Sequence, residues 1–158
     1  MLEIVEYSAE YCDWARKLLK ASWGSTKVVT RYKVYEADKL PGFVALIDGR
    51  EAGLVTYRIE GEELEIVTLD AAEEKMGVGT ALIVRVRDLA EEAGVKRIWL
   101  ITTNDNINAL RFYQKRGFML KAVYPKALDI SRRLKPSIPL IGLQGIPLRD
   151  EIELELAV

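Results

Sequence analysis

The sequence predicts a mixed α/β fold, and three observations support this expectation. Short alternating strands come first, and helices that alternate with strands follow. The chain has 158 residues, of which 49% are hydrophobic and 30% are charged. This length and composition suit one domain with a buried core. We therefore expect a single domain over residues 1–158, of the α/β (α+β mixed) class, with helices on both sides of a central sheet.

The N-terminal half predicts mostly strands. Residues 2–7 alternate as a strand does, and Ser8 is placed to cap a helix that ends near Ser22. Residues 23–41 have no clear period and predict a loop with some strand. A meander follows, because Asp48-Gly49 is a strong hairpin signal. Its strands are expected at 43–47, 51–60 and 63–70.

The C-terminal half predicts alternating helices and strands. The helices are expected at 77–93, 106–116 and 126–135, with Gly94 and Gly117 ending the first two. The strands are expected at 96–102, 118–123 and 151–156. The first of these is apolar on both faces, which is typical of a central strand. The last alternates acids with apolar residues and predicts a half-buried strand. A long proline-marked loop precedes it.

The composition excludes several classes of protein. The net charge of −1 and the pI of about 5.7 argue against nucleic-acid binding by broad phosphate attraction. The chain has no histidine, which excludes His-based triads and most zinc sites, so no metal is expected. The lone Cys12 cannot form an internal disulfide and predicts a small buried hydrophobe. With no apolar run of spanning length and no signal segment, we expect a cytoplasmic protein without a membrane partner.

A glycine-rich junction between a strand and a helix is the first candidate site. Gly77 and Gly79 open the helix expected at 77–93, and Thr80 adds a hydroxyl. Backbone N–H groups at such a helix start can bind phosphate. The pattern lacks the Lys of a Walker A loop and the third glycine of a dinucleotide fingerprint. By itself it is equally consistent with a flexible turn.

A second motif makes the first more specific. The segment 106–118 opens with Asn106 and Ala109, continues with Phe112-Tyr113, and ends with Gly117-Phe118. Together with Gly77-Val78-Gly79-Thr80-Ala81-Leu82, it resembles the two signature motifs of the GNAT N-acetyltransferases, over roughly residues 43–123. The order and the separation of the two motifs also match.

The resemblance implies a fold, a cofactor and site residues. The fold has a central, mostly antiparallel mixed sheet with a splayed parallel strand pair, and acetyl-CoA lies in the gap. Tyr113 would protonate the departing thiolate, a role that a phenol can fill. The residues implied to contact acetyl-CoA are Val67, Thr68, Leu69, Lys75, Met76, Gly77, Val78, Gly79, Thr80, Asn104, Asn106, Ala109, Phe112 and Tyr113.

One position departs from the family pattern. Glu74 stands where the family usually has Gln or Arg, so it adds negative charge beside the expected phosphate site, and Lys75 can offset it. The departure keeps open a second hypothesis, a catalytically weak or inactive GNAT-like module that binds or senses CoA. Simpler interpretations also remain: Tyr113 as a core aromatic residue, and Asn106 as only a helix cap.

The acceptor side is less defined. We expect a small-molecule or peptide amine as acceptor and allow for a homodimer. The candidate bases are Glu65, Asp70 and Asp105. Asp70 lies on the opposite strand face from Glu65 unless a bulge intervenes. Thr103 or Asn104 is hypothesised to orient the substrate, and Trp23, Arg31 and Tyr32 lie where such enzymes build substrate walls.

Overall fold

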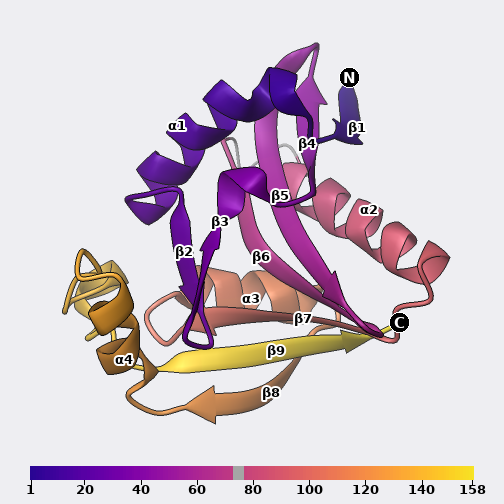
Figure 1. Ribbon diagram of the computed structural model, residues 1–158. Helices are drawn as coiled ribbons and strands as arrows, with labels where there is room; N and C mark the ends of the chain where they lie inside the picture. Colours follow the sequence, from indigo (N-terminus) through magenta and orange to yellow (C-terminus); the bar gives the residue numbers. More distant parts are fainter. Residues whose placement is uncertain (73–76) are drawn as a thin grey trace. The chain divides into compact units, whose positions relative to one another are not determined.

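The computed structural model describes residues 1–72 and 77–158. The chain divides into two compact units. The first unit comprises residues 1–28, 36–98 and 158, and the second comprises residues 29–35 and 99–157. Each unit is a layer of strands with helices, so the mixed α/β class expected from the sequence is confirmed (Figure 1).

The first unit contains the meander predicted from the sequence. Its strands lie in the order β1-β4-β5-β6, and each neighbouring pair is antiparallel. Asp48 and Gly49 both have positive φ, 48° and 81°, which is the conformation that a two-residue hairpin turn requires. The strand bounds are β1 (Leu2–Glu6), β4 (Gly42–Ile47), β5 (Arg50–Glu60) and β6 (Glu63–Ala71).

Two helices complete the first unit, α1 (Cys12–Trp23) and α2 (Val78–Glu92). At Gly53 of β5, an added Cβ would lie 2.4 Å from Cγ1 of Val78, so α2 packs directly on this strand. The next residue, Leu54, points to the other face of the strand, and its partner Asp70 on β6 points to that same face. Trp23 of α1 donates a hydrogen bond to Asp70, so α1 lies on this second face. The two helices therefore lie on opposite faces of these strands (Figure 1).

The start of α1 differs from the prediction. Ser8 was expected to cap the helix, but a 3₁₀ turn, η1 (Ala9–Tyr11), comes first and α1 begins at Cys12. The Ser8 side chain makes no capping hydrogen bond. The lone Cys12 is consequently in the first turn of α1 and is only partly buried, whereas the sequence predicted a small buried hydrophobe.

In the second unit, β7, β9 and β8 lie side by side in that order. They are β7 (Arg97–Thr103, from Trp99 onward in this unit), β8 (Met119–Tyr124) and β9 (Glu151–Ala157), with α3 (Ile107–Lys115) and α4 (Ala127–Leu134). The alternation over 151–156 predicts a half-buried strand, but the face of β9 that carries the acids is itself buried near the start of the strand. Glu151 is 1% exposed and Glu153 is 8% exposed.

A short hairpin occupies part of the segment expected to be mostly loop. Its strands are β2 (Lys27–Thr30) and β3 (Lys33–Glu36), followed by η2 (Ala37–Lys39). The turn residues Arg31 and Tyr32 have φ of 43° and 67°. The left-handed conformation costs roughly 1–2 kcal/mol for a residue that has a Cβ. Contacts made by these two side chains must offset that cost.

Candidate active site

A β-bulge sets the direction of the polar side chains on β6. Thr68 pairs with Thr56, whereas Ile66 pairs with Tyr57, so Val67 is an extra residue on β6. A bulge of one residue shifts the alternation of side chains along the strand. Glu65 and Asp70 therefore share one strand face with Thr68. Parity alone had placed Asp70 on the opposite face.

The three polar side chains on this face, the β6 row, have different surroundings. Glu65 is 1% exposed, and its Oε1 accepts a hydrogen bond of 2.7 Å from Nε of Arg58. Thr68 shares a hydrogen bond of 2.6 Å with the hydroxyl of Thr56. Asp70 is only partly buried, and its Oδ2 accepts a bond of 2.9 Å from Nε1 of Trp23. Of the two acids, Asp70 is the one that a solvent molecule or substrate can reach.

Burial also changes the basicity of Asp70. Loss of solvent raises the pKa of the Asp70 carboxyl above its ordinary value, and hydrogen bonds from Trp23 and Ser22 oppose that rise only in part. A carboxylate with a raised pKa binds a proton more readily near neutral pH than an exposed one does. Asp70 thus has a property that general bases need.

The start of α2 has the geometry expected of an anion site. Gly77 precedes the helix with φ 72°, and among the described residues, its chain neighbours aside, no atom lies within 4 Å of where its Cβ would be. The first N–H groups of a helix have no acceptors within it and carry the positive end of the helix dipole. The Val78 side chain is fully buried, so Val78 can offer only its backbone, while Gly79 and Thr80 are partly exposed. Glu74, Lys75 and Met76 lie outside the described residues.

Helix α3 holds Tyr113 firmly. Asn106 caps the helix, because its Oδ1 accepts a hydrogen bond of 3.1 Å from the Ala109 backbone N–H. The Tyr113 ring is 8% exposed and makes edge contacts with Phe112 at 5.1 Å and with Phe118 at 5.4 Å. Two packed neighbours fix the plane of the ring, which is what a precisely directed phenol requires.

The polar end of β7 holds the segment 136–150, which we call the tail. The Asn104 side chain donates to Pro147 O at 2.8 Å and accepts from the N–H groups of Arg149 and Asp150 at 3.0 and 2.9 Å. The Asp105 carboxylate accepts from the Leu143 N–H at 2.8 Å. Substrate orientation by Asn104 or Thr103 remains a hypothesis, but Asn104 already has three partners within the chain.

A buried polar cluster in the second unit was missed from the sequence. Arg31 donates twice to Glu151, from its backbone N–H at 3.3 Å and from Nη1 at 3.0 Å. The Arg31 guanidinium lies 3.4 Å from the Tyr124 ring centroid and 4.6 Å from that of Tyr32. Tyr124 in turn donates to Glu153 at 2.7 Å. Burial raises the pKa of Glu151, and the bonds from Arg31 oppose that rise.

This cluster explains why a non-glycine turn is tolerated at the tip of the β2–β3 hairpin. The sequence offered one indirect signal, the occurrence of Arg31 and Tyr32 where a turn usually has Asn or Gly. Their partners on β8 and β9 are about a hundred residues away and could not be inferred. Within residues 1–72 and 77–158, no group of three His, Cys, Asp or Glu side chains could hold a metal ion.

The mixed strands, the glycine at the start of α2 and the Asn106-capped α3 define an acetyltransferase fold of the GNAT type. The family model "Acetyltransferase (GNAT) family" matches residues 8–118, about two thirds of the chain. The chain belongs to this family, as its resemblance to the two signature motifs had implied.

The chain is also similar in sequence to two other bacterial proteins. The Bacillus subtilis protein YdhI is 46% identical over 131 residues, which cover 82% of each chain. The streptothricin acetyltransferase of Streptomyces lavendulae is 35% identical over 81 residues, 48% of this chain and 43% of that protein.

Solved structures confirm the fold. The IAA acetyltransferase of Bacillus cereus has a TM-score of 0.78 at 20% identity, with both chains fully covered. A GNAT acetyltransferase of Elizabethkingia anophelis with acetyl-CoA bound has a TM-score of 0.71 at 19% identity, covering 99% of this chain and 98% of the other.

Proposed function

We propose that this chain transfers an acetyl group from acetyl-CoA to a primary amine by direct attack. The observation that carries the proposal is the packing of Tyr113, whose motif resembles the one that supplies the family's general acid: aromatic rings hold it on a helix capped by Asn106. Membership of the GNAT family and a structural neighbour with bound acetyl-CoA support the choice of donor.

Each step has a group in the chain that can perform it. The neutral amine nitrogen attacks the thioester carbonyl carbon, the C–S bond breaks, and the Tyr113 hydroxyl donates a proton to the departing thiolate. The nitrogen must also lose a proton. Asp70 is the base that we favour for two reasons. Partial burial raises the pKa of its carboxyl, and its side chain is still more exposed than that of Glu65. Glu65 is bound to Arg58 and has little access to solvent.

The residues present suit the donor. The first N–H groups of α2, after Gly77, would receive the pyrophosphate. The backbone of Val67, Thr68 and Leu69, next to the bulge, would pair with the amides of the pantetheine arm. Asn106 would act mainly through its cap, which fixes the position of α3.

The proposal is tested first by binding and then by turnover. Calorimetric titration with acetyl-CoA should give saturable binding, whereas ATP should not bind. Transfer to a panel of amines should then fall by about 100-fold or more in kcat for Tyr113→Phe. Tyr57→Phe, which changes a partly buried tyrosine of the first unit, serves as control and should retain full activity.

The two hypotheses predict different outcomes. Acetyl-CoA binding without transfer to any amine would favour the catalytically weak or inactive sensor module. Transfer that is unchanged in Tyr113→Phe would keep the enzyme but reject this phenol as its acid.

A further inference from the structure

The structure assigns a surface of the second unit, formed by α4 and the tail, as a contact site for an anionic lipid surface. This α4–tail surface consists of Lys126, Arg133, Leu134, Leu140, Ile141 and Leu143. The inference does not depend on the proposed acetyl transfer. It departs from the expectation of no membrane partner, which rested on the lack of an apolar run of spanning length and of a signal segment.

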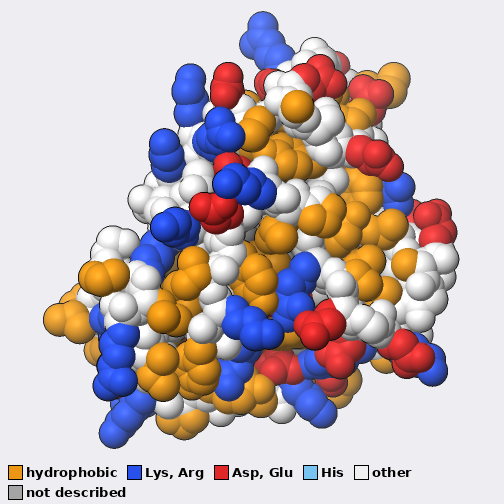
Figure 2. Space-filling view, viewed as in Figure 1, with side chains coloured by type: hydrophobic (Ala, Val, Ile, Leu, Met, Phe, Trp, Pro, Cys, Tyr) orange, Lys and Arg blue, Asp and Glu red, His pale blue; other side chains and the backbone are white. Residues whose placement is uncertain are grey.

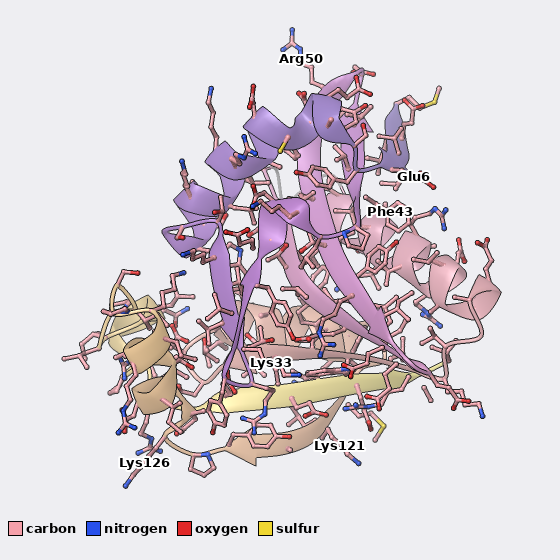
Figure 3. All side chains as sticks on the ribbon, in the orientation of Figure 1. Glu6, Lys33, Phe43, Arg50, Lys121 and Lys126 are labelled. Carbon is pink, nitrogen blue, oxygen red and sulfur yellow. The ribbon has the colours of Figure 1, made fainter. Side chains whose placement is uncertain are left out.

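Local charge is the first argument. The whole chain has a net charge of −1, but residues 126–143 carry four cations, Lys126, Arg132, Arg133 and Lys135, against one acid, Asp129. That acid is already within 3.3 Å of Arg132. Lys126 and Arg133 are exposed, and Lys126 points away from the strands (Figure 3). A basic segment of this kind is attracted to anionic headgroups.

Exposed apolar side chains on the same segment are the second argument. Leu140 is 71% exposed, Ile141 57% and Leu143 53%, and Leu134 of α4 is 46% exposed. Figure 2 shows hydrophobic and basic side chains gathered over α4 and the tail, with no acidic side chain among them in this view. Basic and large apolar side chains on one surface are typical of segments that lie in the membrane interface.

The exposure of these side chains does not come from a loose backbone. Arg132 binds the carbonyls of Pro139 and Leu148. Asp105 binds the Leu143 N–H, and an added Cβ on Gly142 would lie 2.1 Å from the Asp105 Oδ2. The backbone is thus held on both sides of the exposed residues while Leu140, Ile141 and Leu143 project into solvent.

Other occupants fit this surface less well. A second copy of the chain would bring the same cations face to face, which is unfavourable. An acidic protein would pair with the cations, but its carboxylates would not bury Leu140, Ile141 and Leu143, as a lipid interface does. Insertion of a few apolar side chains within a basic rim is sufficient for a lipid surface.

The experiment is co-sedimentation of the full chain with phosphatidylcholine vesicles, with and without phosphatidylglycerol. We expect binding only to the anionic vesicles, weakened by salt. Reversing one charge with Arg133→Glu should weaken binding by about tenfold or more. The double variant Leu140→Ser with Ile141→Ser should abolish it. Met119→Ser is the matched control, because Met119 is also 71% exposed but lies on β8, outside the basic segment.

Four results would overturn the inference: no binding to anionic vesicles, equal binding to neutral vesicles, unchanged binding of the leucine–isoleucine double variant, or equal loss in Met119→Ser. Binding to a soluble polyglutamate peptide that survives the double variant would favour an acidic protein instead. Thermal melts show whether the variants fold, and Arg133→Glu, on an exposed side chain, remains informative if the double variant does not.

Discussion

The β6 row and the polar end of β7 are both strand segments rich in polar residues, yet their side chains are used differently. On β6, Glu65 and Thr68 bind neighbours on the adjacent strand, and Asp70 remains partly exposed with a raised pKa. After β7, Asn104 and Asp105 direct their side chains to the backbone of the tail. A polar side chain near the end of a strand is thus a stronger candidate for function when it stays partly exposed, as Asp70 does, than when it holds another part of the backbone in place, as Asn104 and Asp105 do.

The largest expected effect tests the β7 end. Gly142→Ala would place a Cβ against the Asp105 carboxylate and should destabilise the fold by about 3 kcal/mol. Gly145→Ala is the control in the same segment. Its φ is 74°, but no atom lies within 4 Å, so only the conformational cost of about 1 kcal/mol is expected. Urea unfolding measures both, and equal losses would show that the tail moves away from Asp105 without cost.

The next effect tests the β6 row. Asp70→Asn should lower kcat for amine transfer by about 100-fold if Asp70 is the base. Glu65→Gln should have a smaller effect on kcat, because Glu65 is buried and bound to Arg58. The comparison needs initial rates at saturating acetyl-CoA. A larger loss in Glu65→Gln than in Asp70→Asn would reverse the assignment of the two acids.

The next prediction concerns Asn104→Ala, a change at the residue that follows the end of β7. The variant loses three hydrogen bonds to the tail, and we expect a loss of about 2 kcal/mol in the free energy of unfolding. Asn108→Ala, an exposed residue on α3, should cost less than about 0.5 kcal/mol. If Asn104→Ala instead raised the KM of the amine and left stability unchanged, Asn104 would be a substrate contact.

Thr68→Val should cost about 1 kcal/mol, because it leaves the buried Thr56 hydroxyl without this partner. The double variant Thr56→Val with Thr68→Val removes both hydroxyls and should be closer to wild type than the single variant. A double-mutant cycle from thermal or urea unfolding gives the coupling free energy between the Thr56 and Thr68 hydroxyls. Additive losses would mean that the two hydroxyls contribute independently.

The smallest effect is a pH dependence of stability. Burial raises the pKa of Asp70, so the folded state binds its proton more tightly than the unfolded state. Below the ordinary carboxyl pKa near 4, Asp70 is protonated in both states and does not lower the free energy of unfolding. As the pH rises toward the raised pKa of the folded state, the Asp70 carboxylate lowers the free energy of unfolding progressively. Asp70→Asn should be slightly more stable than wild type near neutral pH and lose that advantage in acid. Unfolding at both pH values checks the sign.

Local chemistry allowed much of this fold to be predicted. Asp48-Gly49 marked its hairpin, and the Asn106 cap and Gly117 marked α3, because each signal depends on residues close in sequence. The bulge at Val67 was not predictable, since it depends on the pairing of β6 with β5. The burial of Glu151 was not predictable either, because its partner Arg31 is 120 residues away.

The hairpin tip at Arg31 and Tyr32 has a consequence for the order of events on the ribosome. These residues are made early, whereas Glu151 follows Arg31 by 120 residues. Synthesis proceeds at about 5–20 residues per second, so the turn must wait several seconds or longer for its ionic partner. A truncation that removes β9 should leave this hairpin without a stable conformation, although every residue of the hairpin itself is present.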